Sequence, residues 1–343
     1  MPNPTIRATL YALTDRGLTR EHNEDTFLVA DLGTPYPMRA SERIDHEVGP
    51  RGLMYLVADG MGGAAAGELA SEMAAVTIHR HMVDVWGEDL DVSEGRFVRR
   101  LREAVETANG ALHSYATEHA DVRGMGTTAT VAGVWGERLY LAQIGDSRGY
   151  LVRNGETRQL TRDQSLTQRL VEVGELTEEE AEQSARRNII LQALGPDPKV
   201  KVDMSWQALQ RGDLLIICSD GLSSVVRKAD IAQVATPTAS VESICADLVA
   251  LANERGGPDN ITVVAVRFDG DGLPEVADDE PGYHEFLTTD EVPALALTAA
   301  IPAIPRPEPP PPPARRGSPT GVALLVLAVA LGLVAVAMWL RAG

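Results

Sequence analysis

The sequence is poor in basic residues, and this shortage excludes one class of partner. Lysine and arginine number 31 against 49 aspartates and glutamates, which leaves a formal net charge of −18 at pH 7. Binding to a nucleic-acid backbone needs clustered cations, so we expect no nucleic-acid partner. A phosphoester substrate is still compatible with this charge, because a bound cation can reverse the local field.

Cysteine is almost absent, and the N-terminus has no long apolar run. Cys218 and Cys245 are too few for a disulfide framework and have no zinc-site spacing. Both stand in apolar segments, which predicts buried free thiols and suits a reducing cytosol. The opening stretch "MPNPTIRATLYALT" lacks the apolar core of a signal peptide, so we expect none.

The longest apolar run stands near the C-terminus. Residues 321–340 carry no charge and are long enough to span a bilayer, and Trp339 suits its interface. A buried core helix is the alternative, but a proline-rich stretch precedes this run. Arg315 and Arg316 come before it and Arg341 after it, which favours a cytoplasmic N-terminal domain.

The pattern divides the chain into four parts. Residues 1–269 are predicted to form one folded domain, because apolar and amphipathic segments alternate there without a long polar gap. Residues 270–320 are predicted to be an acidic and then proline-rich linker, an extended polyproline spacer in its second half. Residues 321–340 are the predicted transmembrane helix, and residues 341–343 a short tail.

The domain is predicted to contain many strands and a few long helices. Apolar, β-branched runs predict strands at 53–59, 128–135, 139–145, 149–155, 213–220 and 261–268. The Asn-Gly pair of "RNGE" (153–156) predicts a hairpin turn. A helical period, carried in the first case by Leu69, Met73 and Val76, predicts helices at 67–86, 94–119 and 240–254. Because strands and helices do not alternate strictly, an α+β fold is favoured.

Four aspartates stand at the ends of predicted strands beside glycine or proline. They are Asp59 in "LVADGMGG", Asp146 in "IGDSRG", Asp220 in "CSDG" and Asp259 in "GGPDN". An ionised carboxylate at the end of an apolar strand is costly without a partner, and Arg148 is the nearest basic residue. One Asp-Gly pair alone is better explained as a plain turn, but four together indicate a cation site.

The candidate ligands are all oxygens, without a cluster of histidine or cysteine. Oxygen ligands suit Mg²⁺ or Mn²⁺ rather than structural zinc. The glycine after Asp59 lets a backbone carbonyl approach an ion. Two ions that share carboxylates can activate a water and hold both oxygens of an in-line phosphoryl displacement. His79 and His81 face different ways on one helix, so both cannot serve one ion.

A further motif, "TDRGLTREHNED" at residues 14–25, places Arg20 shortly before Glu24 and Asp25. A guanidinium can hold a phosphate through two parallel hydrogen bonds. Taken alone, the motif is better explained as a charged loop with local ion pairs.

Together, six short motifs resemble the metal-dependent serine/threonine protein phosphatases of the type 2C class, the PPM family. In order they are TDxGxxRxxNED, ADGMGG, GMGTT, GDSRG, CSDG and GGPDN, and they cover nearly all of residues 5–268. The resemblance implies a central β-sandwich of two antiparallel sheets flanked by helices. It also implies hydrolysis of phosphoserine and phosphothreonine on proteins by a metal-activated water, with a serine/threonine kinase and its substrates as partners.

The resemblance assigns five residues to a metal centre. It implies that Asp59 bridges two Mn²⁺ or Mg²⁺ ions, and that the Gly60 carbonyl binds one of them. Asp220 and Asp259 would complete the pair. Asp146, together with Asp220, would hold a third and weaker ion.

Three other residues are implied to act on substrate or water. Arg20 would grip the substrate phosphate, and Glu24 and Asp25 would order metal-bound waters. Met61 departs from the histidine that is often found in eukaryotic-type members and is thought to protonate the leaving group. Methionine cannot do so, which leaves the proton donor open.

A stretch at about 163–190 has the helical, charged pattern of a mobile lid, or flap, over the cleft. Bacterial relatives often have a His-Pro pair where Ser184 and Ala185 stand here. The resemblance links that pair to control of the third ion, so the control is in question for this chain.

We therefore expect a membrane-tethered protein phosphatase whose catalytic domain lies on the cytoplasmic side. One alternative is a dinucleotide-binding oxidoreductase, since residues 60–65 fit GxGxxA and Asp84 follows about twenty residues later. Asp59 would then point its charge at the pyrophosphate, which disfavours that reading. The other alternative is a tethered, non-catalytic pseudophosphatase, but the four aspartates and Arg20 are all present.

Overall fold

The computed structural model describes residues 5–38, 41–184, 186–187, 189–275 and 280–287. These residues belong to one compact unit, Met1–Glu291. Within them no helix is long and apolar enough to cross a membrane. The predicted transmembrane helix at 321–340 and most of the predicted linker lie outside the described residues.

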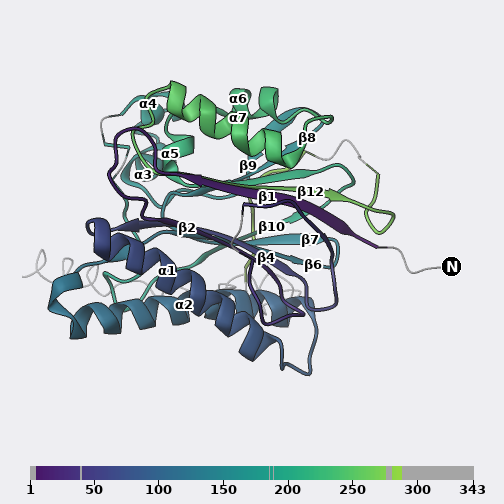
Figure 1. Cartoon of the computed structure of the whole chain (residues 1–343), viewed down its shortest axis with the longest axis horizontal. Helices are drawn as coiled ribbons and strands as arrows, with labels where there is room; N and C mark the ends of the chain where they lie inside the picture. Colours follow the sequence, from purple (N-terminus) through teal and green to yellow (C-terminus); the bar gives the residue numbers. More distant parts are fainter. Residues whose placement is uncertain (1–4, 39–40, 185, 188, 276–279, 288–343) are drawn as a thin grey trace, which may run out of the picture. The chain divides into compact units, whose positions relative to one another are not determined.

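Two antiparallel sheets stack face to face at the centre of this unit (Figure 1). The first has the strand order β3 (Ile44–Glu47), β1 (Arg7–Asp15), β12 (Ile261–Asp269), β11 (Leu214–Cys218), β8 (Arg148–Arg153) and β9 (Glu156–Gln159). The second has the order β13 (His284–Glu285), β10 (Asp203–Ala208), β7 (Arg138–Ile144), β6 (Ala129–Trp135), β4 (Leu53–Met61) and β2 (Asp25–Asp31). The short β5 (Gly126–Thr127) pairs with the end of β4. The predicted sandwich is confirmed.

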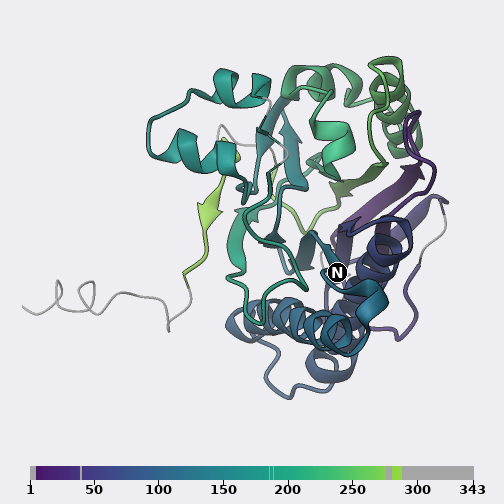
Figure 2. The same ribbon diagram turned by 90° about the vertical axis from the view of Figure 1, so that its left-hand side faces the viewer.

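Helices cover the outer face of each sheet (Figures 1 and 2). The second sheet carries α1 (Ala64–His81), which continues as a π-helical turn at Met82–Trp86, and α2 (Glu94–Glu118). The first sheet carries α5 (Asp220–Ser223), α6 (Lys228–Val234) and α7 (Val241–Glu254). Two short helices, α3 (Leu166–Glu172) and α4 (Glu178–Gln183), form the flap. A 3₁₀ turn at Ala120–Val122 follows α2.

Three apolar clusters hold these layers together. Leu215 and Val264 belong to the one between the two sheets, Phe97 and Leu101 to the one under α1 and α2, and Cys245 to the one under α7. Burial of apolar area on this scale is the main favourable contribution to folding. Both cysteines are buried free thiols, as predicted.

The predicted hairpin at "RNGE" is confirmed by backbone geometry. Asn154 has φ 55° and Gly155 has φ 78°, and the turn joins β8 to β9. A two-residue turn with positive φ at both positions matches the right-handed twist of its strands.

The residues that carried the helical period of α1 do not form its innermost stripe. Ala70, Ala74 and Ile78 are fully buried, whereas Leu69 and Met73 are only partly buried and pack against the same cluster. Alanines let the helix approach the second sheet closely, so the innermost stripe is made of small side chains. The larger residues, which dominated the sequence pattern, lie beside that stripe.

Candidate metal centre

The predicted acidic residues come from the ends of strands in both sheets. Asp59 stands near the end of β4 and is the register partner of Asp25, the first residue of β2. Asp146 follows β7, Asp220 follows β11, and Asp259 precedes β12. We call these five residues the acidic cluster.

The GMGTT motif holds the backbone of Asp59. The Asp59 amide donates to the Thr128 hydroxyl at 3.0 Å, and the Asp59 carbonyl accepts from the Thr128 amide and the Thr127 hydroxyl, both at 2.9 Å. The hydroxyls of Thr128 and Ser147 share a further bond of 2.7 Å. Sequence reasoning identified this motif but gave its threonines no role.

Gly60 is a glycine because of close packing. A Cβ there would lie 2.1 Å from the Gly67 carbonyl oxygen and 2.7 Å from that of Glu24. The Gly60 amide donates to the same Glu24 oxygen at 3.2 Å. The residue thus fixes the contact between β4, the start of β2 and the first turn of α1.

Asp25 is buried and bridges the two sheets. Its Oδ2 accepts from the hydroxyls of Ser219 and Thr262, each at 2.7 Å. Burial raises the pKa of Asp25 to about 7, although these two hydrogen bonds lower it and the charges of Asp220 and Asp259 raise it. The side chain therefore lies within the acidic cluster, and its predicted action on metal-bound water stays a prediction.

The other carboxylates repel one another in the same way. Burial raises the pKa of Asp59 well above its usual range, and the charges of Asp25, Asp220 and Asp146 add to this. Burial also raises the pKa of Asp146 to about 8, and it raises the pKa of Asp220, to which the charge of Asp259 adds. Desolvated like charges of this kind are relieved by a cation.

Three oxygens in the cluster are orphaned. Among the described residues, Asp25 Oδ1, Asp146 Oδ1 and Asp220 Oδ1 are buried without a hydrogen-bond partner. Buried polar atoms are normally paired, so an all-oxygen set with open lone pairs fits a hard divalent cation.

The carboxylates of the cluster do not surround one point at which an ion could bind. In the part of the chain that the structure describes, no group of three or more His, Cys, Asp and Glu side chains is arranged to hold a metal. Asp259 turns instead to Arg20, whose Nη2 donates to Oδ2 at 2.6 Å. The cluster members are neighbours, and their roles as ligands stay a prediction.

The loop that carries Arg20 is fixed by a residue that sequence reasoning missed. Asn260 is buried, and its amide nitrogen donates to the carbonyls of Arg16 and His22 at 2.9 and 2.8 Å. Its side-chain oxygen accepts from the Glu24 amide at 2.8 Å. The signal was present in "GGPDN", where an amide side chain directly follows the candidate ligand.

The Glu24 carboxylate lies against α1. Its Oε2 would be 1.8 Å from a Cβ built on Gly67. Burial raises the pKa of Glu24, the charge of Arg20 lowers it, and that of Asp259 raises it again. Glu24 thus faces the same charges as the cluster, although its contact with water stays a prediction.

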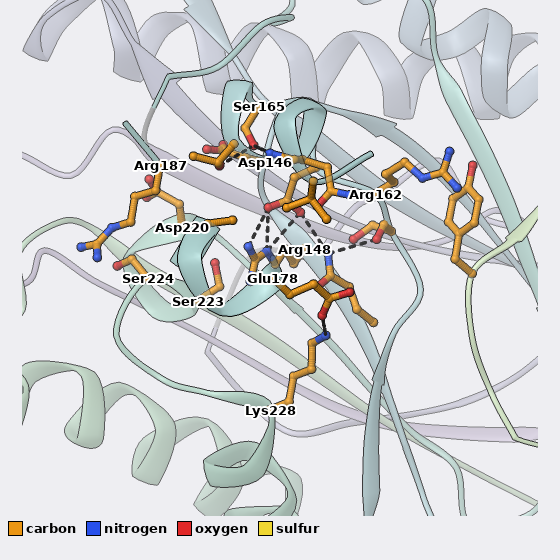
Figure 3. A pocket seen from close by; sticks show the side chains of 18 of the residues that line it. Asp146, Arg148, Arg162, Ser165, Glu178, Arg187, Asp220, Ser223, Ser224 and Lys228 are labelled. Carbon is orange, nitrogen blue, oxygen red and sulfur yellow. Dashed lines mark hydrogen bonds and ion pairs between the residues drawn. The ribbon is translucent and has the colours of Figure 1, made fainter. Parts of the chain in front are cut away.

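The flap begins at the loop of Asp146. Gln164 and Gly145 exchange two bonds, of 2.8 Å from the Gln164 amide and 2.9 Å from the Gly145 amide. Arg148 donates to both oxygens of Asp163 at 2.7 to 3.1 Å. The predicted helices of the flap are confirmed, and side chains from α3 and α4 line a cavity that also contains Asp146 and Asp220 (Figure 3).

Comparisons with known proteins point to one family. Residues 43–254 match the family model described as protein phosphatase 2C. The serine/threonine phosphatase stp of Listeria monocytogenes is 36% identical over 257 residues, which are 75% of this chain and 94% of that protein. The crystal structure of the Mycobacterium tuberculosis serine/threonine phosphatase PstP/Ppp has 35% sequence identity and a TM-score of 0.63, and covers 77% of this chain and 99% of its own. A structure of the PstP catalytic domain in complex with two manganese ions has 34% identity and a TM-score of 0.62, and covers 77% and 100%.

Proposed function

This chain belongs to the protein phosphatase 2C family and is a metal-dependent serine/threonine protein phosphatase, and we propose how its residues serve that activity. We propose that the acidic cluster holds two Mn²⁺ or Mg²⁺ ions and that the enzyme hydrolyses phosphoserine and phosphothreonine on proteins. Substrates of a serine/threonine kinase are the proposed partners. The observation that carries the proposal is the set of orphaned carboxylate oxygens at one end of the sandwich.

Within this proposal the ligands are Asp59, the Gly60 carbonyl, Asp220 and Asp259. When bound, such ions activate a water and neutralise the charge of the phosphoryl group. Support for a third ion comes from Asp146 and Asp220, which line the same cavity and each have one buried oxygen without a partner in the described part of the chain.

The chain's own cations and carboxylates prepare the site for a phosphate. Arg20 is 49% exposed, so its guanidinium is accessible from solvent, and it can hold two phosphate oxygens at once. Its present partner, Asp259, is one of the proposed ligands. We propose that ion binding at Asp259 releases Arg20 for the substrate.

The direct test is hydrolysis of para-nitrophenyl phosphate by the full-length protein purified in detergent. We expect turnover with Mn²⁺ or Mg²⁺, loss of turnover on chelation, and recovery when the ion is returned. Turnover that survives chelation contradicts the metal role. Phosphopeptide binding without turnover would instead indicate a pseudophosphatase, and saturable binding of a nicotinamide cofactor would support the oxidoreductase alternative.

We also propose that residues 321–340 anchor the enzyme to a membrane, with the catalytic domain on the cytoplasmic side. The support is the twenty-residue uncharged run and its arginine flanks. The full chain should sediment with membranes, and a chain that ends at residue 320 should not. In the full chain, protease should reach the catalytic domain only from the cytoplasmic side. A full chain recovered in the soluble fraction would overturn the anchor.

A further inference from the structure

A cationic cavity lies beside the acidic cluster. It has a volume of about 330 Å³, and both Asp146 and Asp220 are in its wall. This size is at the small end of ligand pockets, which are typically on the order of 300–1,000 Å³. A phosphorylated side chain fits such a space, whereas a folded partner does not.

The rest of the wall is strongly basic. Six arginine or lysine side chains line the cavity: Arg148, Arg158, Arg162, Arg187, Arg227 and Lys228. Four carboxylates face them, but Asp146 and Asp220 are proposed to be balanced by ions. Asp163 is occupied by Arg148 through three hydrogen bonds. Arg158 pairs with Glu156 and Glu280, which lie outside the wall. With ions in place, the lining side chains still carry an excess of positive charge.

Two of these cations pair with carboxylates of the flap. Arg162 Nε lies 3.7 Å from Glu172 of α3, and Lys228 Nζ lies 3.9 Å from Glu178 of α4 (Figure 3 shows the second pair). Both distances are long, and the Glu178 side chain is 76% exposed. Exposed pairs of this kind contribute little free energy, so a stronger anion can displace them.

From this geometry we propose that the cavity is a subsite for a second phosphate on the same substrate. The inference rests on the proposed function, because the first phosphate would lie at the acidic cluster. A phosphate dianion offers several acceptor oxygens to the cations of the cavity, whereas each flap carboxylate makes one long contact with its cavity cation, and Glu172 also accepts from Arg169 at 3.0 Å. The flap carboxylates hold the cations in place until the substrate anion replaces them. The preferred substrate is therefore a multiply phosphorylated segment.

The test compares matched peptides with the full-length enzyme. Each pair shares one phosphothreonine and differs by a second phosphate, placed one to four residues away on either side. In the wild type, at least one spacing should raise kcat/KM about tenfold or more over the singly phosphorylated peptide, mainly through KM. Turnover of para-nitrophenyl phosphate reports the metal centre separately, so its absence would refute the proposed function and not the subsite alone.

Two variants distinguish a phosphate subsite from an ion pair that only stabilises the flap. Lys228→Gln should reduce the preference for the second phosphate several-fold, while Glu178→Gln should keep or raise it because Lys228 is then released. Neither should change turnover of para-nitrophenyl phosphate. Arg96→Gln, which removes a similar 3.7 Å pair with Asp91 outside the cavity, is the matched control and should leave the preference unchanged.

Three outcomes would overturn the proposal. One is equal kcat/KM for all peptide pairs in the wild type. Another is a shift of the preference in the same direction by Lys228→Gln and Glu178→Gln, which is the behaviour of a structural ion pair. The third is a result in which inorganic phosphate inhibits Lys228→Gln less than the wild type, while singly and doubly phosphorylated peptides have equal kcat/KM. The cavity would then bind the released phosphate and not a second phosphate of the substrate.

Discussion

Asp220→Asn is expected to reduce phosphatase turnover about a thousandfold or more. Asp220 stands at the start of α5, feels the negative charge of Asp259, and has one buried oxygen without a partner among the described residues. An amide keeps the shape but removes the charge that an ion needs. Phosphomonoester hydrolysis is extremely slow without catalysis, so lost transition-state stabilisation appears almost entirely in kcat.

The measurement is single-substrate kinetics with para-nitrophenyl phosphate, together with calorimetric titration of Mn²⁺. Asp247→Asn, an exposed carboxylate on α7, is the matched control and should behave like the wild type. Near-normal turnover in Asp220→Asn would remove Asp220 from the proposed ligand set.

Arg20→Ala should weaken substrate binding and not metal binding, which distinguishes the role of Arg20 from that of the proposed metal ligands. Arg20 now competes with any ion for Asp259, so its removal should leave Mn²⁺ affinity equal or higher. Substrate affinity should fall instead, because the phosphate loses a bidentate donor. Equal losses of substrate and metal binding would contradict the role given to Arg20.

Much of the sandwich could be predicted from the sequence, because its central strands are continuous apolar runs. The run at 53–59 became β4 and that at 261–268 became β12, each nearly fully buried. β2, which pairs with β4, was missed because its apolar centre, residues 27–30, is short and aspartates stand at both ends of the strand. Periodicity reports apolar length, so polar strand ends at a site escape it.

The candidate ligands could be predicted from the sequence because each of them stands in its own short motif. The aspartates stand next to glycines in short, ordered motifs, and the structure brings them to one end of the sandwich. The supporting residues were not predictable, because they act through tertiary contacts. Thr262 of β12 and Ser219, which directly follows β11 of the same sheet, reach Asp25 from the other side of the sandwich, and each has an ordinary hydroxyl in the sequence.

The residues that line the cavity were even less predictable from the sequence. Arg162 follows β9 and Lys228 begins α6, and neither belongs to a recognisable motif. Charges so far apart in sequence become a site only when the flap places its carboxylates beside both. The spacing of residues along the chain contains no trace of that arrangement.

The largest expected loss of stability comes from a buried ion pair far from any motif. Arg153 and Asp213 are 1% and 0% exposed, and two hydrogen bonds of 2.8 Å join them. Arg153 also donates to the Ala208 carbonyl, and Asp213 accepts from the Gln210 amide. The pair joins the end of β8 to the start of β11, beside the turn that leads into β9.

Arg153→Met should lower the free energy of unfolding by about 3–5 kcal/mol, because it leaves the Asp213 carboxylate buried without its cation. For a domain of this size the expected fall in melting temperature is roughly 10 °C. The double variant Arg153→Met, Asp213→Asn should recover part of the loss, since the uncompensated charge is removed. Urea unfolding measures both, and Arg43→Met, which breaks an exposed pair with Asp45, is the control. If Arg153→Met and Arg43→Met shift the urea midpoint equally, burial of the pair does not determine its contribution.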